Sequence, residues 1–438
     1  MKTLLTALVL ATSASFVCAS AQTINSSHEI SLQQALNLSL QHNPQLAGYQ
    51  FRRAALVGEQ TSANLRPQTH IQLEAENLAG SGDYTGADAA EFTLSFASII
   101  ELHGQRDSRV AVTTARQQQL ESEKRVAVLD LVAAVNYRFV ALLAAQEQVK
   151  LEEEAQRLAQ DLVNSLIKRV QAGSTPQAEL MRARAALART EIALEKTRQQ
   201  AQQEAMQLSA YWADATPDFT HARGDLFALS YLENLGPENL GPESLANWQS
   251  RLAQNPDLAL LGDASRLRAA ELRKLEAESK STLGWSAGVR QFQETSDTAL
   301  VVGLSMPLGS GKRASGALQT ARAEQDAAEF AEDSAKSQLQ IRLNQTFSQH
   351  QQAWSEVQSL RERILPLMQE ASRATANAFE QGRYSSLELA MAQRELLDTR
   401  AELISAALRA HETRIELERL TASAQSATAP ATEFEVTP

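Results

Sequence analysis

The chain has almost no cysteine, which limits both its cross-linking and its metal chemistry. Cys18 is the single cysteine among 438 residues, and Ala19-Ser20-Ala21 follows it directly. A start of Met1-Lys2, an apolar run to Val17 and this small-x-small site predict a secretory signal peptide over residues 1–21. Cleavage after Ala21 would remove Cys18 and leave a mature chain with no disulfide and no cysteine-based metal site. Lipidation of Cys18 is the alternative, although Val17 stands where a lipoprotein signal has a small residue.

Positive charge and long apolar runs are also scarce. The formal net charge is −11, from 41 Lys+Arg against 52 Asp+Glu, and removal of Lys2 with the signal peptide makes it about −12. An acidic chain argues against nucleic acid as a partner, because nucleic acid needs a basic surface. We find no stretch after residue 21 that is apolar over the ~18 residues that a membrane-spanning helix needs. We therefore expect a protein that is either soluble in the periplasm or crosses a membrane as β-strands.

Motifs for catalysis and metal binding are missing as well. The sequence has no Walker loop, G-x-S-x-G or dinucleotide fingerprint, and Gly309 to Lys312 lacks the context of a phosphate loop. The histidines never pair at the i, i+4 ligand spacing, so we predict no metal site and read His350 as a core or inter-helix hydrogen-bonding group. Glu74 and Glu76 share one face of a predicted strand; a glycosidase pair is the alternative to a polar row facing a lumen. We expect neither a cofactor nor an enzyme.

Two copies of one pattern make up most of the chain. Asn43-Pro44-Gln45-Leu46-Ala47 resembles Asn255-Pro256-Asp257-Leu258-Ala259, and Gly173 with Glu179-Leu180 resembles Gly382 with Glu388-Leu389. Such matches are 206 to 212 residues apart along the whole chain, which indicates an internal duplication. We predict structural repeats at 22–212 and 244–421, a turn-rich connector at 213–243 and a disordered tail at 422–438.

Each copy predicts the same order of elements. A helical segment from Ser31 to Leu65, interrupted at Asn43-Pro44, precedes a hairpin, a helix over about 105–171, and a last helix from Gln177 to about Trp212. A helix of that length is a rod of roughly 100 Å. We expect the two shorter helices to stack end to end along the long one, because their combined length matches it. Apolar spacings of 4 and 3 predict coiled-coil seams at Val128, Val132, Val135, Phe139 and Leu142, and at Leu343, Phe347, His350, Trp354 and Val357.

Strict alternation of apolar and polar residues predicts two β-hairpins, over 68–101 and 281–308. Ile71 and Leu73 alternate with polar residues in the first, and Leu300, Val302 and Leu304 alternate with small or apolar ones in the second. Four strands cannot close a barrel wide enough for a channel, and strands that face lipid must belong to a closed barrel. Several chains must therefore contribute strands if these hairpins lie in a membrane.

With these features the sequence resembles the TolC-like outer-membrane efflux proteins. The resemblance rests on the duplication, on the two Asn-Pro elements, and on two glycine turns that are each followed by an acid six residues later. Within the family it is similar to the CzcC-like heavy-metal branch, through Leu65-Arg66-Pro67, Leu73-Glu74-Ala75-Glu76-Asn77, Gly80-Ser81-Gly82 and Ile100-Glu101-Leu102-His103-Gly104-Gln105-Arg106. In the last of these segments that branch typically has the sequence E-L-G-G-K-R, and His103 and Gln105 depart from this pattern. In the second copy, Gly311-Lys312-Arg313 retains the final G-K-R of the pattern.

The resemblance implies a homotrimer, with a twelve-stranded barrel in the cell outer membrane and a helical tunnel in the periplasm. It implies a periplasmic adaptor (membrane fusion) protein and an inner-membrane proton-driven pump as partners, besides outer-membrane lipid. The adaptor is expected to dock at the two tip turns, which are Gly173, Ser174, Thr175 and Pro176, and Gly382, Arg383, Tyr384 and Ser385, with Ser386 closing the second.

The resemblance also implies a ring of acids that narrows the tunnel near these tips. The matching residue is Glu388, with Glu179 as its equivalent in the first copy; a second acid of some members is Met391 here. A plain helix-start acid, favoured by the helix dipole, is the alternative for Glu388.

The sequence thus predicts a mainly α protein with a small β part that passively conducts heavy-metal cations out of the cell. A channel for drug efflux or type I protein secretion remains an alternative. So does a soluble periplasmic coiled-coil scaffold, which needs no strands facing lipid.

Overall fold

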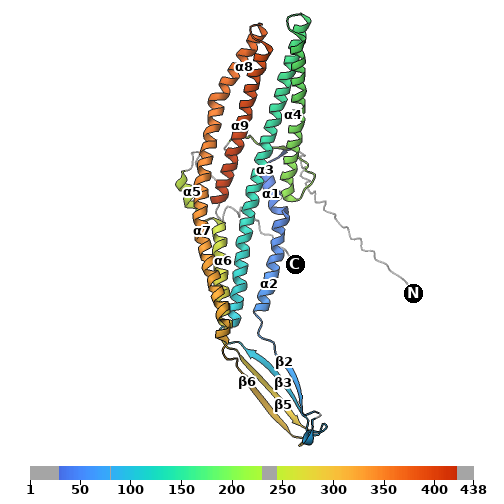
Figure 1. The fold of residues 1–438 in the computed structure, drawn as a ribbon, viewed down its shortest axis with the longest axis vertical. Coiled ribbons are helices and arrows are strands. Elements are labelled where there is room, and N and C mark those ends of the chain that lie inside the picture. Colours follow the sequence, from blue (N-terminus) through green and yellow to red (C-terminus); the bar gives the residue numbers. More distant parts are fainter. Residues whose placement is uncertain (1–28, 79, 229–243, 422–438) are drawn as a thin grey trace, which may run out of the picture.

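Long helices with a small sheet at one end form the whole described part of the molecule (Figure 1). The computed structural model describes residues 29–78, 80–228 and 244–421. The predicted fold class, mainly helical with four strands that could serve a barrel and an internal duplication, is confirmed. The predicted signal peptide at 1–21, the predicted disordered tail at 422–438 and residues 229–243 of the predicted connector lie outside the described residues.

In the first copy, a buried asparagine marks the place where two shorter helices meet. The helices are α1 Leu32–His42, α2 Pro44–Ala63, α3 Gln105–Gln171 and α4 Gln177–Ser209, the last continued by η2 Ala210–Trp212. The side-chain oxygen of Asn43 accepts the N–H of Gln45 at 3.0 Å, which caps α2, as is usual for asparagine at this position. Its Nδ2 donates to the carbonyl of Tyr211 at 2.8 Å. Because α2 begins where α4 ends, the two helices follow α3 end to end, as the sequence predicts (Figure 1).

The second copy repeats this device. Its helices are α5 Leu245–Leu252, α6 Pro256–Glu278, α7 Ser310–Ser359, α8 Leu365–Glu380 and α9 Ser386–Thr421. Asn255 accepts the N–H of Asp257 at 2.6 Å and donates to the carbonyl of Leu420 at 2.7 Å. The two Asn-Pro elements therefore have the same two tasks, to start one helix and to hold the end of another.

The long helix of the second copy differs from the expectation that it would match the first. A π-helical turn, η4 Leu360–Ile364, separates α7 from α8. Pro366 stands at the start of α8 and has no N–H to donate to the carbonyl four residues before it. A π turn, in which hydrogen bonds connect residues five apart instead of four, accommodates the missing N–H donor at this point of the helix.

The largest apolar core lies at mid-height, where α1, α3, α4, α9 and η4 meet. Val135, Phe139 and Leu142 of the first predicted seam are fully buried; in the second seam Leu343 and Val357 are buried, whereas Trp354 is 38% exposed. The expectation that no helix is apolar enough to span a membrane is wrong for α3, one stretch of which meets the length and composition of a span. The reason is packing, because this part of α3 contacts helices on several sides and needs apolar residues on more than one face.

Four antiparallel strands form an open sheet in the order β2-β3-β5-β6. They are β2 His70–Glu76, β3 Glu91–Ile100, β5 Leu283–Phe292 and β6 Thr298–Ser305. The two hairpins are joined through the pairing of β3 with β5, in which Leu94 lies opposite Val289. A further parallel pair, β1 Glu29–Ile30 with β4 His221–Ala222, lies away from this sheet at mid-height.

The register gives the sheet one apolar and one polar face. Leu73, Leu94, Val289 and Leu300 lie side by side across all four strands. Their exposed fractions are 73%, 51%, 48% and 76%, so no described residue of the chain covers this face. Glu74, Thr93, Arg290 and Ala299 form the neighbouring row on the opposite face. Strict alternation along each strand therefore produces the two faces that a membrane barrel needs.

Candidate functional site

The two tip turns at the far end of the helices have the same backbone structure. Gly173 and Gly382 have φ values of 72° and 73°, in the left-handed region that glycine adopts without strain. In the first turn the N–H groups of Gly173 and Ser174 donate to Val170 and Arg169 at 3.0 and 2.9 Å. The second turn repeats this pattern, which is the Schellman ending of a helix. A Cβ at either glycine would meet no heavy atom within 4 Å, so the demand for glycine comes from the backbone alone.

Glu388 lies in the first turn of α9, and its side chain folds back onto the residue before that helix. Its Oε2 accepts the N–H of Ser385 at 2.7 Å and the hydroxyl of Ser385 at 2.9 Å, and its own N–H donates back to that hydroxyl at 3.3 Å. This reciprocal arrangement is a capping box. The hydrogen bonds from Ser385 lower the pKa of Glu388 below its ordinary value. Glu388 is therefore an exposed, ionised carboxylate that stabilises the helix start.

Glu179, the equivalent residue in the first copy, has a different partner. Its Oε2 accepts the hydroxyl of Ser386 from the other tip at 2.6 Å. The structure thus separates two acids that the sequence treats as equivalent. Glu388 serves its own turn, whereas Glu179 connects the tip of one copy to the tip of the other. Met391, where some relatives have a second acid, is 54% exposed.

Arg169 makes a second connection between the tips. Its guanidinium lies over the ring of Phe379 at 4.0 Å and donates a hydrogen bond to the carbonyl of the same residue. Phe379 is only 4% exposed and belongs to an apolar cluster with Leu166 and Leu389. Sequence reasoning missed this contact, because the partners are 210 residues apart and no local spacing joins them.

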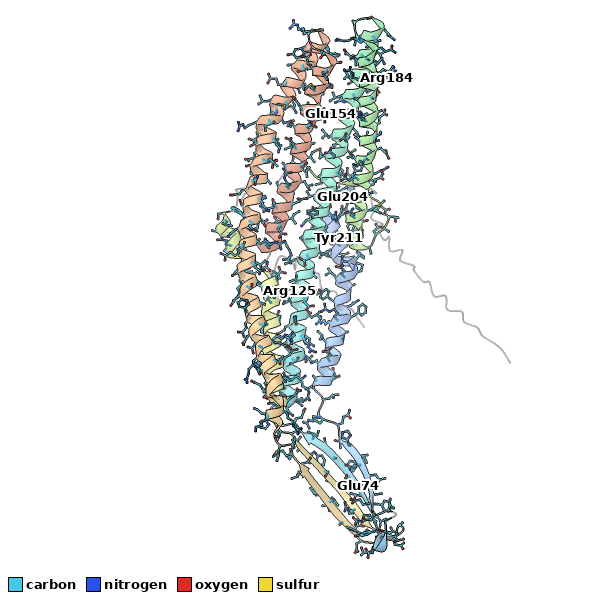
Figure 2. All side chains as sticks on the ribbon, viewed as in Figure 1. Glu74, Arg125, Glu154, Arg184, Glu204 and Tyr211 are labelled. Carbon is cyan, nitrogen blue, oxygen red and sulfur yellow. The ribbon has the colours of Figure 1, made fainter. Side chains whose placement is uncertain are left out.

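The polar face of the sheet carries a second cluster of charge. Arg290 reaches across three strands, to Glu76 at 2.9 Å, Glu91 at 2.8 Å and the hydroxyl of Thr93 at 2.9 Å. Glu74, labelled in Figure 2, lies on the same face and is exposed. Glu76 therefore forms an ion pair with Arg290, and it does not face Glu74 across an enclosed cleft. This geometry favours a row of polar residues over a pair of glycosidase carboxylates.

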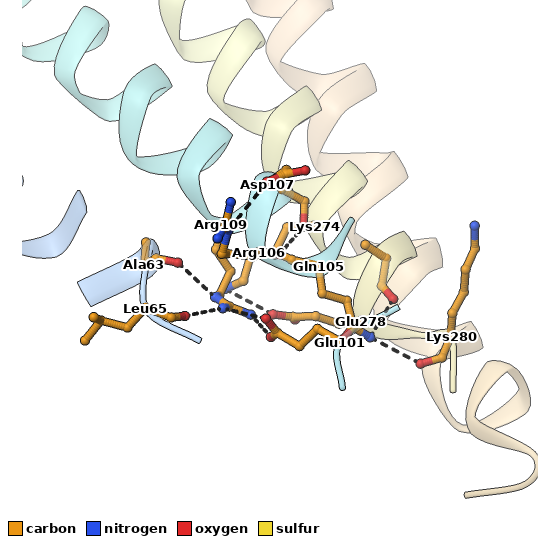
Figure 3. Close-up of polar contacts among 12 residues, drawn as sticks. Ala63, Leu65, Glu101, Gln105, Arg106, Asp107, Arg109, Lys274, Glu278 and Lys280 are labelled. Carbon is orange, nitrogen blue, oxygen red and sulfur yellow. Dashed lines mark hydrogen bonds and ion pairs between the residues drawn. The ribbon is translucent and has the colours of Figure 1, made fainter. Parts of the chain in front are cut away.

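A third polar cluster joins the sheet to the helices (Figure 3). Arg109 pairs with Glu101 and donates to the carbonyls of Ala63 at 3.4 Å and Leu65 at 3.1 Å, at the end of α2. Gln105, at 4% exposed, donates to the carbonyl of Ala277 at the end of α6 at 3.1 Å. Gln105 departs from the pattern of the heavy-metal branch, yet its buried amide connects the two copies. Gly309, at φ 78°, is the N-cap residue of α7, in the segment that joins β6 to this helix.

Within the described ranges, His, Cys, Asp and Glu side chains form no cluster of three or more that could hold a metal ion. His350 is hydrogen-bonded to the hydroxyl of Thr413 at 3.0 Å, between α7 and α9, in agreement with the predicted inter-helix role.

Comparisons with known proteins agree with this architecture. Residues 35–214 and 248–423 each match the family described as outer membrane efflux protein. The chain is 25% identical over 395 residues to the cobalt-zinc-cadmium resistance protein CzcC of Cupriavidus metallidurans, covering 89% of this chain and 90% of CzcC.

Solved structures share the fold at lower identity. The solved structure described as CusC, with reference to transmembrane channel formation, has a TM-score of 0.75 at 16% identity, over 90% of this chain and 92% of that one. The outer membrane protein VceC of Vibrio cholerae has a TM-score of 0.71 at 17% identity, over 90% and 96%. Because the two family matches together cover most of the described helices and both hairpins, the chain belongs to the outer membrane efflux protein family, whose members are channels and not enzymes.

Proposed function

We propose that the chain is one subunit of a homotrimeric outer-membrane channel in a tripartite efflux system, and that it conducts heavy-metal cations passively to the exterior. Three sheets of four strands form a closed twelve-stranded barrel in this proposal, and the helices form a tunnel across the periplasm. A periplasmic adaptor and an inner-membrane proton-driven pump deliver the substrate.

The observation that carries the proposal is the two-faced, open sheet. Its apolar face is exposed in the single chain, with Leu73 and Leu304 each at 73%, and its edge strands β2 and β6 have no further strand beside them in the described ranges. An exposed apolar face is unfavourable in water, and an open sheet edge is a liability in water and does not occur facing lipid. Closure with strands of other copies would pair the open edges, and lipid would cover the apolar face.

Heavy-metal cations are proposed as the substrate on two grounds. The named relative CzcC is a cobalt-zinc-cadmium resistance protein and is similar over nearly the whole length of both chains. The formal net charge of −11 also suits a passage for cations. In the proposed trimer the three copies of Glu388 surround the axis near the tips, and the tip turns at Gly173 and Gly382 dock the adaptor.

Two measurements test the assembly. The mature protein should fractionate with outer membranes and run as a trimer in mild detergent by light scattering. A soluble periplasmic monomer would contradict the proposal and support the scaffold alternative, which the exposed apolar sheet already disfavours.

The substrate needs a separate test. Deletion of the gene should lower the concentrations of cobalt, zinc or cadmium that cells tolerate, and the intact gene should restore them, with organic drugs as the matched comparison. Loss of drug resistance or of a secreted protein, with metal resistance unchanged, would favour the alternative channel functions.

A further inference from the structure

The ends of the four strands that join the helices form a surface of their own, which we call the root surface. Arg109 connects Leu65 with Glu101, Gln105 reaches the carbonyl of Lys280 at 3.4 Å, and the hydroxyl of Ser281 donates to the carbonyl of Pro307 at 2.8 Å. These contacts bring the segments at the roots of β2, β3, β5 and β6 together at one level of the molecule (Figure 3).

Exposed apolar side chains mark this level in both copies. Leu65, Leu102, Met306 and Leu308 are 63%, 37%, 55% and 80% exposed. Leu65 precedes β2, Leu102 follows β3, and Met306 and Leu308 follow β6. In Figure 3 the side chain of Leu65 extends away from the polar cluster. Large apolar side chains left exposed together at one level of a molecule are typical of contact with a partner or a membrane.

Exposed cations lie beside these apolar groups. Arg66, Lys280, Lys312 and Arg313 are all exposed, and no ion pair joins any of them to an acid among the described residues. The nearby acids have other partners, since Glu101 pairs with Arg109, Asp107 with Arg106 and Glu278 with Lys274. Lys312 and Arg313 moreover stand in the first turn of α7, which contains no acid and where the helix dipole disfavours cations. A local excess of unpaired positive charge is notable in a chain with a net charge of −11.

We propose that the root surface docks onto a layer of anionic glycerophospholipid, with the leucines and Met306 entering the acyl boundary and the four cations meeting headgroup phosphates. The proposal rests on the proposed function, which puts the helices in the periplasm and hence the strand roots at the inner leaflet of the outer membrane. Charge complementarity supports lipid over a second copy of this chain as the occupant. A second copy, although acidic as a whole, would bring its own root cations to the same level, where like charges repel. Long cationic side chains next to apolar ones are well suited to a water–lipid boundary.

Trp285 provides a reporter for the test. It lies near the root end of β5, opposite Ser98 and Leu304, whereas the other three tryptophans, Trp212, Trp248 and Trp354, belong to the helical part. The mature protein is placed in phosphatidylcholine vesicles that contain a second lipid with brominated acyl chains, which quench tryptophan fluorescence. In one set this brominated lipid is phosphatidylglycerol, and in the other it is phosphatidylcholine. The relative quenching of Trp285 gives the preference for the anionic lipid around the root.

The intact chain should prefer phosphatidylglycerol, and high salt should weaken the preference. Replacement of Arg66, Lys280, Lys312 and Arg313 by glutamine should abolish the preference for phosphatidylglycerol. Loss of a single cation near an anionic surface should by itself lower this preference roughly fivefold. The control replaces Arg182, Arg184, Arg189 and Lys196 by glutamine. These are exposed cations of α4 that form no ion pair with an acid among the described residues. They lie far from the root, as Arg184 in Figure 2 illustrates. The control loses the same charge and should keep the preference.

Three results would overturn the inference. The intact chain shows no preference for the anionic lipid; the root variant keeps the preference of the intact chain; or the root variant only weakens the trimer, in which case a second copy covers the surface. Channel conductance in pure phosphatidylcholine separates this inference from the proposed function. A root variant that conducts normally but lacks the preference supports both, whereas absence of Trp285 quenching by either lipid contradicts both.

Discussion

At the scale of single residues, Glu388 combines a structural contact with a proposed place on the channel axis. We expect Glu388→Gln to reduce the preference for cations and the block of the pore by trivalent ions in single-channel recordings, since three carboxylates around a narrow aqueous passage attract cations. Stability should change little, because glutamine also completes a capping box. Glu179→Gln is the matched control, with a smaller expected effect on block. Unchanged selectivity and block in Glu388→Gln would leave it as a helix-start acid only.

The pH dependence of that block follows from the pKa of Glu388. The hydrogen bonds from Ser385 lower the pKa of Glu388 below its ordinary value, so the carboxylate stays charged to lower pH than one without these hydrogen bonds. Block by trivalent ions should therefore persist across the neutral and mildly acidic range and be lost only as pH falls through the lowered pKa. A Ser385→Ala variant removes the hydroxyl donor and should move the loss of block to higher pH.

Arg169 is the residue whose loss should loosen the contact between the tips. Arg169→Ala removes the cation over Phe379 and a hydrogen bond to its carbonyl, and a cation over an aromatic ring contributes about 0.5–2 kcal/mol. We expect faster amide hydrogen exchange in both tips, at residues 169–180 and 379–389. Arg182→Ala, which removes an exposed cation of α4, should leave exchange unchanged. Equal exchange in the two variants would mean that the apolar cluster and the Glu179–Ser386 hydrogen bond join the tips without help from Arg169.

At the scale of elements, the two tip turns depend on the left-handed conformation of one glycine each. Valine at Gly173 and Gly382 should strain each turn by at least about 1–2 kcal/mol, because φ is positive at both positions. We expect the double variant to lose efflux and adaptor binding, measured by metal tolerance and by cross-linking, while trimers still appear in the outer membrane. Asparagine, which tolerates this conformation, is the control and should retain both. Normal metal tolerance in the valine variant would argue against docking at the tips.

At the scale of the whole molecule, the buried His411 and the half-buried His350 in the helical part make stability depend on pH. Burial lowers the pKa of His411, which is 3% exposed and hydrogen-bonded to the carbonyl of Leu226 at 2.8 Å, and it lowers the pKa of His350 as well. The unfolded chain then binds protons at higher pH than the folded one, so stability is complete above about pH 6.5 and is lost as pH falls towards the folded pKa values.

The melting temperature should therefore decrease between about pH 7 and pH 5, and His411→Gln should flatten this decrease. Glutamine can still donate to Leu226, so its stability at neutral pH should remain close to that of the intact chain. His42→Gln, at an exposed position, is the control and should keep the full pH dependence. An unaltered profile in His411→Gln would assign the pH dependence to other groups.

Much of the architecture could be predicted from local patterns. The duplication, the Asn-Pro elements and the glycine turns are short-range signals, and each has one physical cause: Asn43 and Asn255 cap the helices that follow them, and Gly173 and Gly382 adopt positive φ. Alternation along the strands likewise predicted the faces of the sheet. The π turn at Leu360–Ile364 was missed, although Pro366 was a visible signal, because a proline within a helix can be absorbed in several ways.

The sequence by itself determined which segments are helices, strands and turns, because capping, glycine conformation and side-chain periodicity act within a few residues. Only the tertiary structure decided which distant residues meet. It assigned Glu179 to Ser386 and Glu388 to its own turn, although the two acids occupy equivalent positions in the copies. It also brought the four root cations, which lie next to β2, β5 and β6, to one level. Such contacts depend on how the two copies pack against each other, and packing at separations of some 200 residues leaves no periodic trace in the chain.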